Sequence, residues 1–450
     1  PLSAEAANTG GGLGIAEALE ILERGKGANL RPEIRPEIRD NPRAVFIIET
    51  RIDARKDANG FFTEARPQLE EAGKLAARSI FVKGSRRGGS TVIIPNFTTV
   101  SDRLANPVIG IITSPDFIAG FVEALRDIGN TNAMVSERGG SMKSRQVTGV
   151  YDIFDRRNIR LIEASYRRVS DYSRGEINWS NVPGNPMVMK KIPTTRPVGD
   201  KDCFYINMPK LKSHNLGLTT LSIKNIQGAV PVGYGHFCNR WPTVEFLARL
   251  SYGTDFDGVF VKDYYQNVER EFLRHREMGF KHWDYENAYP AYEKKGGWEA
   301  FRKIKHDSRL IKEFTAGIEN VMYDETWCQR AIDAVSAVKP GVNIIEGVIG
   351  RDGSGFDHGT DYLVNYIVIG LSRLETDSVA SILMGQNPLE LYYTRIGKER
   401  GLGENNPEKI QINWIRENGS IEPVKNLGEL RRTPLGVNLH AFRDKELLFW

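Results

Sequence analysis

The chain has 450 residues, which is enough for two or three domains or for one large, elaborated domain. Hydrophobic residues make up 40% and charged residues 26% of it, the ordinary composition of a globular protein. A net charge of +4, from 61 basic and 57 acidic residues, is too balanced to indicate binding to nucleic acid or to an anionic membrane. No apolar run approaches the ~18 residues of a membrane span.

The sequence lacks the cysteine spacings and the short motifs that identify the common enzyme classes. Cys203, Cys238 and Cys328 lie far apart, and no Cys-x-x-Cys motif is present. Zinc-ribbon and iron–sulfur spacings are therefore absent, so we expect no iron–sulfur cluster. The serine-hydrolase, zinc-protease, P-loop and Rossmann motifs are absent from the sequence as well.

Residues 1–43 are predicted to form an N-terminal extension. The loose opening PLSAEAANTGGG lacks a methionine and is typical of residues that follow a removed leader, so we expect a periplasmic or extracellular protein. A trimmed record is the alternative. The repeat RPEIRPEIR, residues 31–39, should run as an extended arm because proline fixes φ and biases its predecessor toward extended geometry. If ordered, it should dock through Ile34 and Ile38, on its own domain or on a neighbouring subunit.

Residues 44–250 alternate between strand and helix patterns, which predicts the first part of an α/β core. This pattern favours a mostly parallel sheet with helices on both faces. Ser114 should cap a helix that has Pro115 at its first position and stops at Gly129. Residues 165–200 are irregular and proline-rich. The expected strands are 44–50, 91–94, 133–137 and 160–163, and the other expected helices are 64–82 and 143–156.

The stretch 202–231 is the most informative part of the sequence. A short strand, 203–208, breaks at Pro209 and is followed by Lys210, Lys212 and His214. Buried lysines need partners, and strand carboxyl ends are where α/β folds bind ligands. We therefore expect an anionic ligand, a carboxylate or a phosphate, at this loop. The alternative is a solvated loop whose lysines only keep it soluble. The same stretch adds Lys224 and Asn225 as ligand-binding candidates.

Residues 251–327 are predicted to be an aromatic-rich helical insertion. Aromatic residues dominate interface energetics, so the insertion is interpreted as a lid or a subunit contact, with a self-packed helical subdomain as the alternative. His275 and His282 could align on one helix face as metal ligands. No third ligand has helical spacing, so packed or exposed histidines are expected instead.

Residues 328–450 are predicted to complete the α/β core, with a C-terminal hairpin around Asn418-Gly419 and a tail. We expect a helix at 324–338, strands at 342–346 and 363–371, a helix capped by Thr376, and another at 388–400. A glycine-rich loop spans 350–359. Glu346, Asp352 and Asp377, with Asp357 as a further candidate, carry oxygen ligands suited to a divalent cation, although Asp and Gly also cap turns routinely.

Several motifs resemble those of one family. NMPKLKSH, residues 207–214, is followed by TLSIKNIQGAVP, residues 220–231. Pro95-Asn96, TSPD at 113–116, NIIEG at 343–347, the segment 352–359 and LETDSVASILMG at 374–385 fit the same pattern. Together they resemble the family catalogued as domain of unknown function 362, over roughly residues 90–415 with an interruption at about 251–327. The resemblance implies an α/β protein, often exported, without a settled activity. Some relatives carry iron–sulfur clusters, but this chain lacks the cysteines.

Two functional hypotheses remain. The first is an exported α/β protein, open to an enzymatic role, that binds a small anionic molecule or a divalent metal in a crevice around the Lys-Leu-Lys-Ser-His loop. His214 would exchange a proton near neutral pH and Lys212 would act with it. The alternative is a structural, self-assembling homo-oligomer that uses the arm, the insertion and the tail as contacts. The ligand-binding candidates are Asn96, Glu137, Lys210, Lys224 and Asn225.

Overall fold

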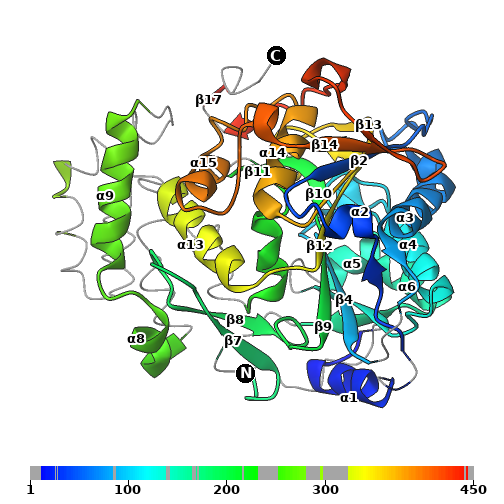
Figure 1. Ribbon diagram of the computed structural model, residues 1–450, viewed down its shortest axis with the longest axis horizontal. Helices are drawn as coiled ribbons and strands as arrows, with labels where there is room; N and C mark the ends of the chain where they lie inside the picture. Colours follow the sequence, from blue (N-terminus) through cyan, green and yellow to red (C-terminus); the bar gives the residue numbers. More distant parts are fainter. Residues whose placement is uncertain are drawn as a thin grey trace.

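A computed structural model of the chain gives the architecture (Figure 1). The structure describes residues 12–25, 27, 29–84, 88–137, 142–164, 169, 172–214, 217–231, 252–279, 294–296, 300, 323–439 and 442–443.

The core of the described chain is one 11-stranded, mostly parallel sheet, which confirms the predicted α/β class. The order is β15-β14-β2-β13-β12-β9-β4-β5-β6, and β10 pairs with both β12 and β11. β13, β15 and β11 run antiparallel to their neighbours. The strands of this sheet are β2 (Val45–Glu49), β4 (Ser90–Pro95), β5 (Ala133–Glu137), β6 (Arg160–Glu163), β9 (Cys203–Met208), β10 (Lys210–His214), β11 (Leu218–Thr220), β12 (Val342–Arg351), β13 (Asp361–Gly370), β14 (Ile412–Ile415) and β15 (Ile421–Pro423).

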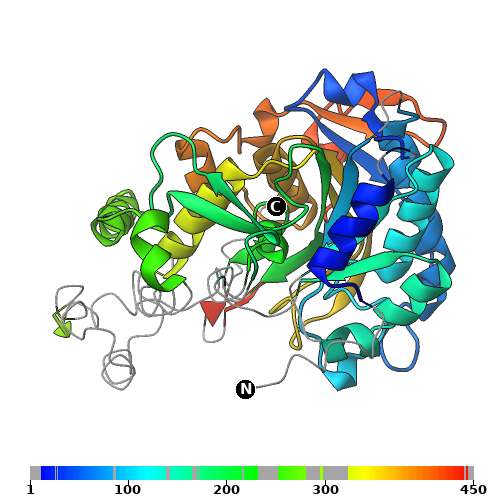
Figure 2. The same cartoon turned by 90° about the horizontal axis from the view of Figure 1, so that it is seen from below.

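Helices cover both faces of the sheet because alternate strand residues are apolar on each side. Ile93 of β4 packs in the cluster that holds the apolar faces of α3 and α4. Val92 and Ile94 pack in the opposite cluster, with α13 and α15. Figures 1 and 2 show these two helical layers on opposite sides of the sheet. The larger helices are α1 (Ile15–Gly25), α3 (Arg66–Ile80), α4 (Pro115–Asp127), α5 (Met142–Val147), α6 (Val150–Arg156), α9 (Tyr264–Glu277), α13 (Tyr323–Ala337), α14 (Arg373–Leu383) and α15 (Tyr392–Glu399).

Most helix predictions hold, and local signals explain the boundaries. Ser114 caps α4: its side chain accepts from the Phe117 N–H at 3.4 Å, and Gly129 ends the turn at φ +88°. The predicted helix 143–156 is two helices, because Gly149 adopts φ +69° between them. The predicted Thr376 cap is wrong: α14 begins earlier, with Ser372 at its N-cap.

The prediction of an extended arm over residues 31–39 is correct only in part. β1 (Glu33–Ile34) is extended and pairs antiparallel with β3 (Phe81–Val82). Pro36 instead starts a short helix, α2 (Pro36–Arg39), because proline is favoured at the first helical position. Ile38 is fully buried in the cluster that also holds Phe81. The arm therefore docks on its own core.

The segment 165–200 is more regular than its composition predicts. β7 (Ile177–Asn181) and β8 (Lys191–Thr195) form an antiparallel pair across five registered residues. The C-terminal hairpin at Asn418-Gly419 is confirmed: β14 and β15 pair antiparallel, and Gly419 takes φ +81°. A short pair, β16 (Asn438–Leu439) and β17 (Phe442–Arg443), follows.

Part of the aromatic-rich insertion lies within the described residues. It contributes α8 (Phe256–Val259) and α9, and α13 spans the predicted boundary at 327–328. Val268 and Phe272 of α9 are buried in the cluster that includes α13 and α15. The rest of the segment, including His282, lies outside the described residues, so the lid or subunit contact stays a prediction.

Candidate functional site

Strand β9 ends before Pro209, and the chain continues as β10, which pairs with the same neighbouring strand, β12. Beyond the break, β10 runs parallel to β12, with Lys210 opposite Glu346 and Lys212 opposite Arg351. Because side chains alternate along a strand, Lys210, Lys212 and His214 leave the same face of β10. All three are buried, at 1%, 1% and 2% exposure. The sequence therefore places three basic side chains in the interior rather than on a solvated loop.

Lys210 has an internal partner. Its ammonium group forms a buried ion pair with the Glu346 carboxylate. Glu346 Oε2 also accepts from the Ser114 N–H at 3.2 Å, and Oε1 accepts from the Val348 and Ile349 N–H groups at 3.1 and 3.4 Å. These last two donors lie at a register shift in β12. The pair thus joins β10, α4 and the bulge of β12.

Lys212 and His214 contact the glycine-rich loop after β12. Lys212 Nζ donates to the Gly355 carbonyl at 3.2 Å and lies 4.5 Å from the Phe356 ring centroid. The His214 ring meets Phe356 edge-on, with 5.3 Å between centroids. Arg351 also holds the loop, donating to the Phe356 carbonyl at 2.8 Å and to the Asp361 carboxylate at 2.6 Å.

Gly355 is expected to tolerate no side chain. Its φ is +68°, and a Cβ there would lie 1.9 Å from the Ser213 carbonyl oxygen of β10. Gly60 has a similar φ of +84° with nothing within 4 Å, so Gly60→Ala is the matched control for the backbone strain. We expect Gly355→Ala to lower the free energy of unfolding by about 2–3 kcal/mol more than Gly60→Ala. Equal losses in urea unfolding would contradict this close packing.

His214 is held as a neutral imidazole. The Gly217 N–H donates to His214 Nδ1 at 3.0 Å, so Nδ1 is the acceptor and the ring proton resides on Nε2. Burial, together with the positive charges of Lys224 and Lys212, keeps the pKa of His214 well below its usual range. This lowered pKa argues against the predicted proton exchange near neutral pH.

Lys224 completes a group that we call the Lys–His cluster: Lys212, His214 and Lys224. Lys224 starts the short helix η5 (Lys224–Ala229), is 5% exposed and donates to Thr220 Oγ1 at 3.5 Å. Thr220 lies opposite Lys212 in the β10–β11 hairpin. The positive charges of Lys224 and Lys212 both lower the pKa of His214. The cluster therefore gathers three hydrogen-bond donors at one place.

A chain of asparagines fixes η5 against the sheet. Asn225 Nδ2 donates to the Ile94 carbonyl and to Asn207 Oδ1, both at 2.9 Å. Asn207 Nδ2 donates to Asn343 Oδ1 at 2.8 Å, and Asn96 Nδ2 donates to Asn225 Oδ1 at 3.4 Å. Of the predicted ligand-binding residues, Asn96 and Asn225 thus lie together at the carboxyl ends of β4 and β9.

Glu137 lies at the same edge of the sheet. It ends β5 and is 3% exposed, and its Oε2 accepts from the Phe97 N–H at 3.4 Å. A Cβ on Gly228 of η5 would lie 2.8 Å from that oxygen, so a glycine is needed for this close approach. The ends of β4 and β5 and helix η5 therefore meet, as expected for parallel strands.

The three candidate metal ligands serve separate roles. Glu346 pairs with Lys210, as described above. Asp352 accepts from the Thr360 N–H and from Tyr362 OH, at 2.5 and 2.9 Å, and closes the glycine-rich loop. Asp377 accepts from the Ser222 and Ile223 N–H groups at 2.7 and 2.8 Å, just before η5, and burial raises its pKa to about 7. Within the described residues, no group of three His, Cys, Asp or Glu side chains could hold a metal ion.

Comparison with known families decides the chain's membership. The model of a family described as Domain of unknown function (DUF362) matches residues 91–381, more than half of the chain. The chain belongs to the DUF362 family. No curated protein and no solved structure matches it. Among the helices that the structure describes, none is long and apolar enough to cross a membrane.

The DUF362 match contains the whole Lys–His cluster and the asparagine chain. Sequence reasoning missed Asn207, Asn343 and Arg351, which support the site from within strands. Asn207 had a usable signal, because an amide in the middle of a buried apolar strand requires a hydrogen-bond partner. The partner of Arg351 could not be predicted, because Asp361 lies on a different strand and faces it only after the β12–β13 pair has formed.

Proposed function

We propose that this DUF362 protein binds a small anionic ligand, a carboxylate or a phosphate, at the Lys–His cluster. One observation carries the proposal: the side chains of Lys212, His214 and Lys224 are all buried, and Lys224 contacts Thr220, which lies opposite Lys212 in the β10–β11 hairpin. Basic side chains gathered in a low-dielectric interior favour an anionic ligand, because their hydrogen bonds to a carboxylate or phosphate are charge-assisted.

The chemistry of the three side chains supports an anion rather than a cation. Lysine ammonium groups only donate, and His214 carries its ring proton on Nε2 because Nδ1 accepts from the Gly217 N–H. Charge-assisted hydrogen bonds to a carboxylate or phosphate are the strongest that such donors form. In a reaction, this set would stabilise negative charge on the bound group, whereas His214 is a poor general base.

A thermal-shift experiment tests the proposal. Phosphate, sulfate, citrate and dicarboxylates are added to the purified protein, and the melting temperature is recorded. A ligand that binds only the folded state adds roughly 2.7 kcal/mol at 100 times its Kd, so the melting temperature should rise. The rise should be lost in Lys212→Met and kept in Lys409→Met, which removes an exposed lysine. A flat response of the unmodified protein to every anion would overturn the proposal.

Export and self-association stay proposals beside this one. Export is supported by the resemblance stated above, and cell fractionation with an antibody against the chain tests it. Self-association through the insertion is tested by light scattering. The arm is a poor candidate for a subunit contact, because β1 and Ile38 are committed to their own core.

A further inference from the structure

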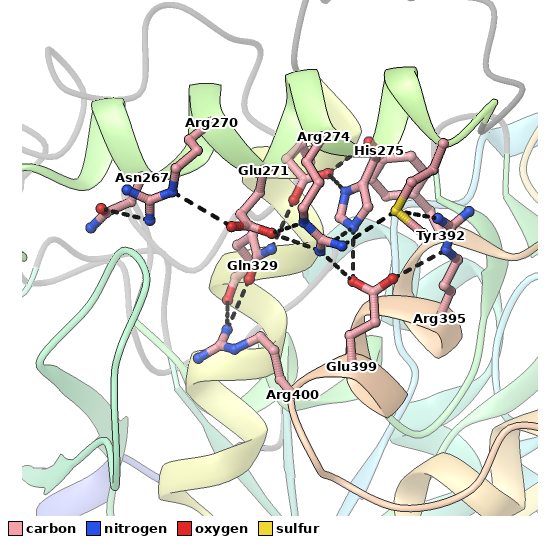
Figure 3. Close-up of polar contacts among 12 residues, drawn as sticks. Asn267, Arg270, Glu271, Arg274, His275, Gln329, Tyr392, Arg395, Glu399 and Arg400 are labelled. Atoms are coloured by element: carbon pink, nitrogen blue, oxygen red, sulfur yellow. Dashed lines mark hydrogen bonds and ion pairs between the residues drawn. The ribbon is translucent and has the colours of Figure 1, made fainter.

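Helix α9 of the insertion is fastened to the core by a buried polar group. Figure 3 shows Arg274 and His275 reaching from α9 toward Glu399 of α15. His275 Nδ1 lies 2.7 Å from Glu325 Oε2 of α13, and His275 Nε2 lies 2.8 Å from Glu399 Oε2. We call His275, Glu325 and Glu399 the His275 clamp. Because its carboxylates come from two different helices, the clamp ties three elements together.

The inner half of the clamp is enclosed. His275 is 1% exposed and Glu325 is fully buried. Tyr392 OH donates to Glu325 Oε2 and Gln329 Nε2 donates to Glu325 Oε1, both at 2.7 Å. The Glu325 carboxylate therefore has donors from α9, α13 and α15. Removing one donor leaves buried charge less well satisfied, which is costly.

The outer half of the clamp faces a groove. Arg274 Nη2 lies 2.8 Å from Glu399 Oε2 and 2.9 Å from His275 Nε2, so two cationic side chains share this carboxylate. Arg395 Nε donates to the other oxygen of Glu399 at 3.3 Å. A groove of about 790 Å³, lined by Arg274, Glu399 and Arg400 among others, gives solvent access to this side.

The apolar face of α9 ends at the clamp. Tyr264, Val268 and Phe272 recur every four residues and are all buried, and His275 follows three residues later on the same face. They share a cluster with Trp327 of α13 and with Tyr393 of α15. The clamp thus fixes how the apolar face of α9 is positioned on α13 and α15.

Helices α13 and α15 also pack against the β10–β11 hairpin. Trp327 follows Glu325 by two residues, and a Cβ on Gly217 would lie 2.8 Å from the Trp327 ring. Trp327 and Tyr393 meet edge-on at 5.7 Å between ring centroids, and Tyr393 OH contacts Thr219 Oγ1. Gly217 is the residue whose N–H fixes the His214 ring. A continuous set of contacts therefore runs from α9 to the Lys–His cluster.

We propose that His275 is a positioning residue for the Lys–His cluster: while the clamp is closed, α13 and α15 pack against Gly217 and Thr219 and hold the His214 ring in its place in the cluster. Loosening α9 loosens this packing, and the hairpin then samples arrangements that bind the anion less well. This proposal rests on the proposed function for the identity of the ligand. The predicted loosening of the β10–β11 hairpin, in contrast, does not depend on any ligand.

Two measurements on His275→Gln test it. The first is the phosphate Kd from titration calorimetry at a temperature where the variant is fully folded. The second is hydrogen exchange of α9 and of residues 217–220. We expect a Kd raised about tenfold, within the usual range of coupling between sites, and faster exchange in both segments. Glu277→Gln is the matched control, because Glu277 is an exposed residue of α9 outside the clamp. It should change neither value.

The outcomes separate this proposal from the function that it extends. Faster exchange of α9 with unchanged exchange at 217–220 and an unchanged Kd would overturn the positioning role and leave anion binding standing. Faster exchange at 217–220 in a protein that binds none of the anions would support the structural coupling and sink the proposed function. Glu399→Gln, which alters the partly exposed member, replaces His275→Gln if that variant does not fold, with the same expectations.

Discussion

Lys210→Met is expected to lower the free energy of unfolding by about 3–5 kcal/mol, because it leaves the Glu346 carboxylate buried without its counter-charge. Both side chains are at most 1% exposed. Glu346 would retain the Ser114, Val348 and Ile349 N–H donors, but these neutral groups do not replace an ammonium ion. The change should appear as a lower midpoint in urea unfolding.

A second substitution identifies the cause. In Lys210→Met/Glu346→Gln the buried charge is removed, while the amide oxygen of the new side chain can still accept from the backbone, so a large part of the lost stability should return. Lys409→Met provides the surface control and should shift the midpoint little. If the double variant were as unstable as Lys210→Met alone, the loss would come from packing and not from the uncompensated carboxylate.

The His275 clamp should make stability depend on pH in the alkaline range. Burial alone lowers the pKa of His275, but hydrogen bonds to Glu325 and Glu399 outweigh it and raise the pKa to about 9. An unfolded histidine titrates near about 6.5. Because the folded value is higher, the contribution is complete below about pH 6.5 and is lost as the pH rises through about 9. A shift of this size corresponds to about 3 kcal/mol.

The charged groups that face His275 also influence how its contribution to stability changes with pH. Within the described residues, Glu325 faces it from α13, Glu399 and Arg395 from α15 with Tyr392 beside them, and Arg274 from α9. The stability difference between the unmodified protein and His275→Gln should shrink between pH 7 and pH 10. Glu277→Gln should keep the unmodified profile. A difference that stays constant over this range would show that His275 is neutral in the folded protein.

The acid side of the profile follows from Glu399. Burial raises its pKa, but the hydrogen bonds and charges of His275 and Arg274 outweigh burial and lower the pKa to about 2. Since an unfolded glutamate titrates near about 4.3, this contribution is complete above that pH and is lost as the pH falls through about 2. The clamp should therefore remain closed from mildly acidic to neutral pH.

The fold class was predictable because its signals are local. Alternating apolar strands and capped helices identify an α/β core, and Ser114, Pro115 and Gly129 bound α4 correctly. The arm and the segment 165–200 were harder to predict. Proline at 36 is compatible with an extended chain and with the first residue of a helix, and burial of Ile38 decides in favour of the helix. The β7–β8 pair forms from a proline-rich segment without a strong strand pattern.

The candidate site was predictable as a set of residues but not as a set of partners. The position of Lys210, Lys212 and His214 after a strand break indicated a buried cationic site. Which carboxylate neutralises which lysine depends on the register of β10 on β12, and sequence alone does not give that register. The protonation state of His214 was unpredictable for the same reason. Gly217 and Lys224 determine its tautomer and its pKa, and both approach it only in the folded chain.

Nuclear magnetic resonance of the histidine side chains tests anion binding at the Lys–His cluster most directly. In protein labelled with ¹⁵N-histidine and assigned with His214→Gln, His214 should be neutral with its proton on Nε2 at neutral pH and should not titrate near pH 6.5. Added phosphate should shift its Nε2–H signal in the unmodified protein and in Lys409→Met, and leave it unmoved in Lys212→Met. A His214 ring that titrates near pH 6.5, or a signal unmoved by phosphate, sulfate and citrate at high concentration, would contradict the account.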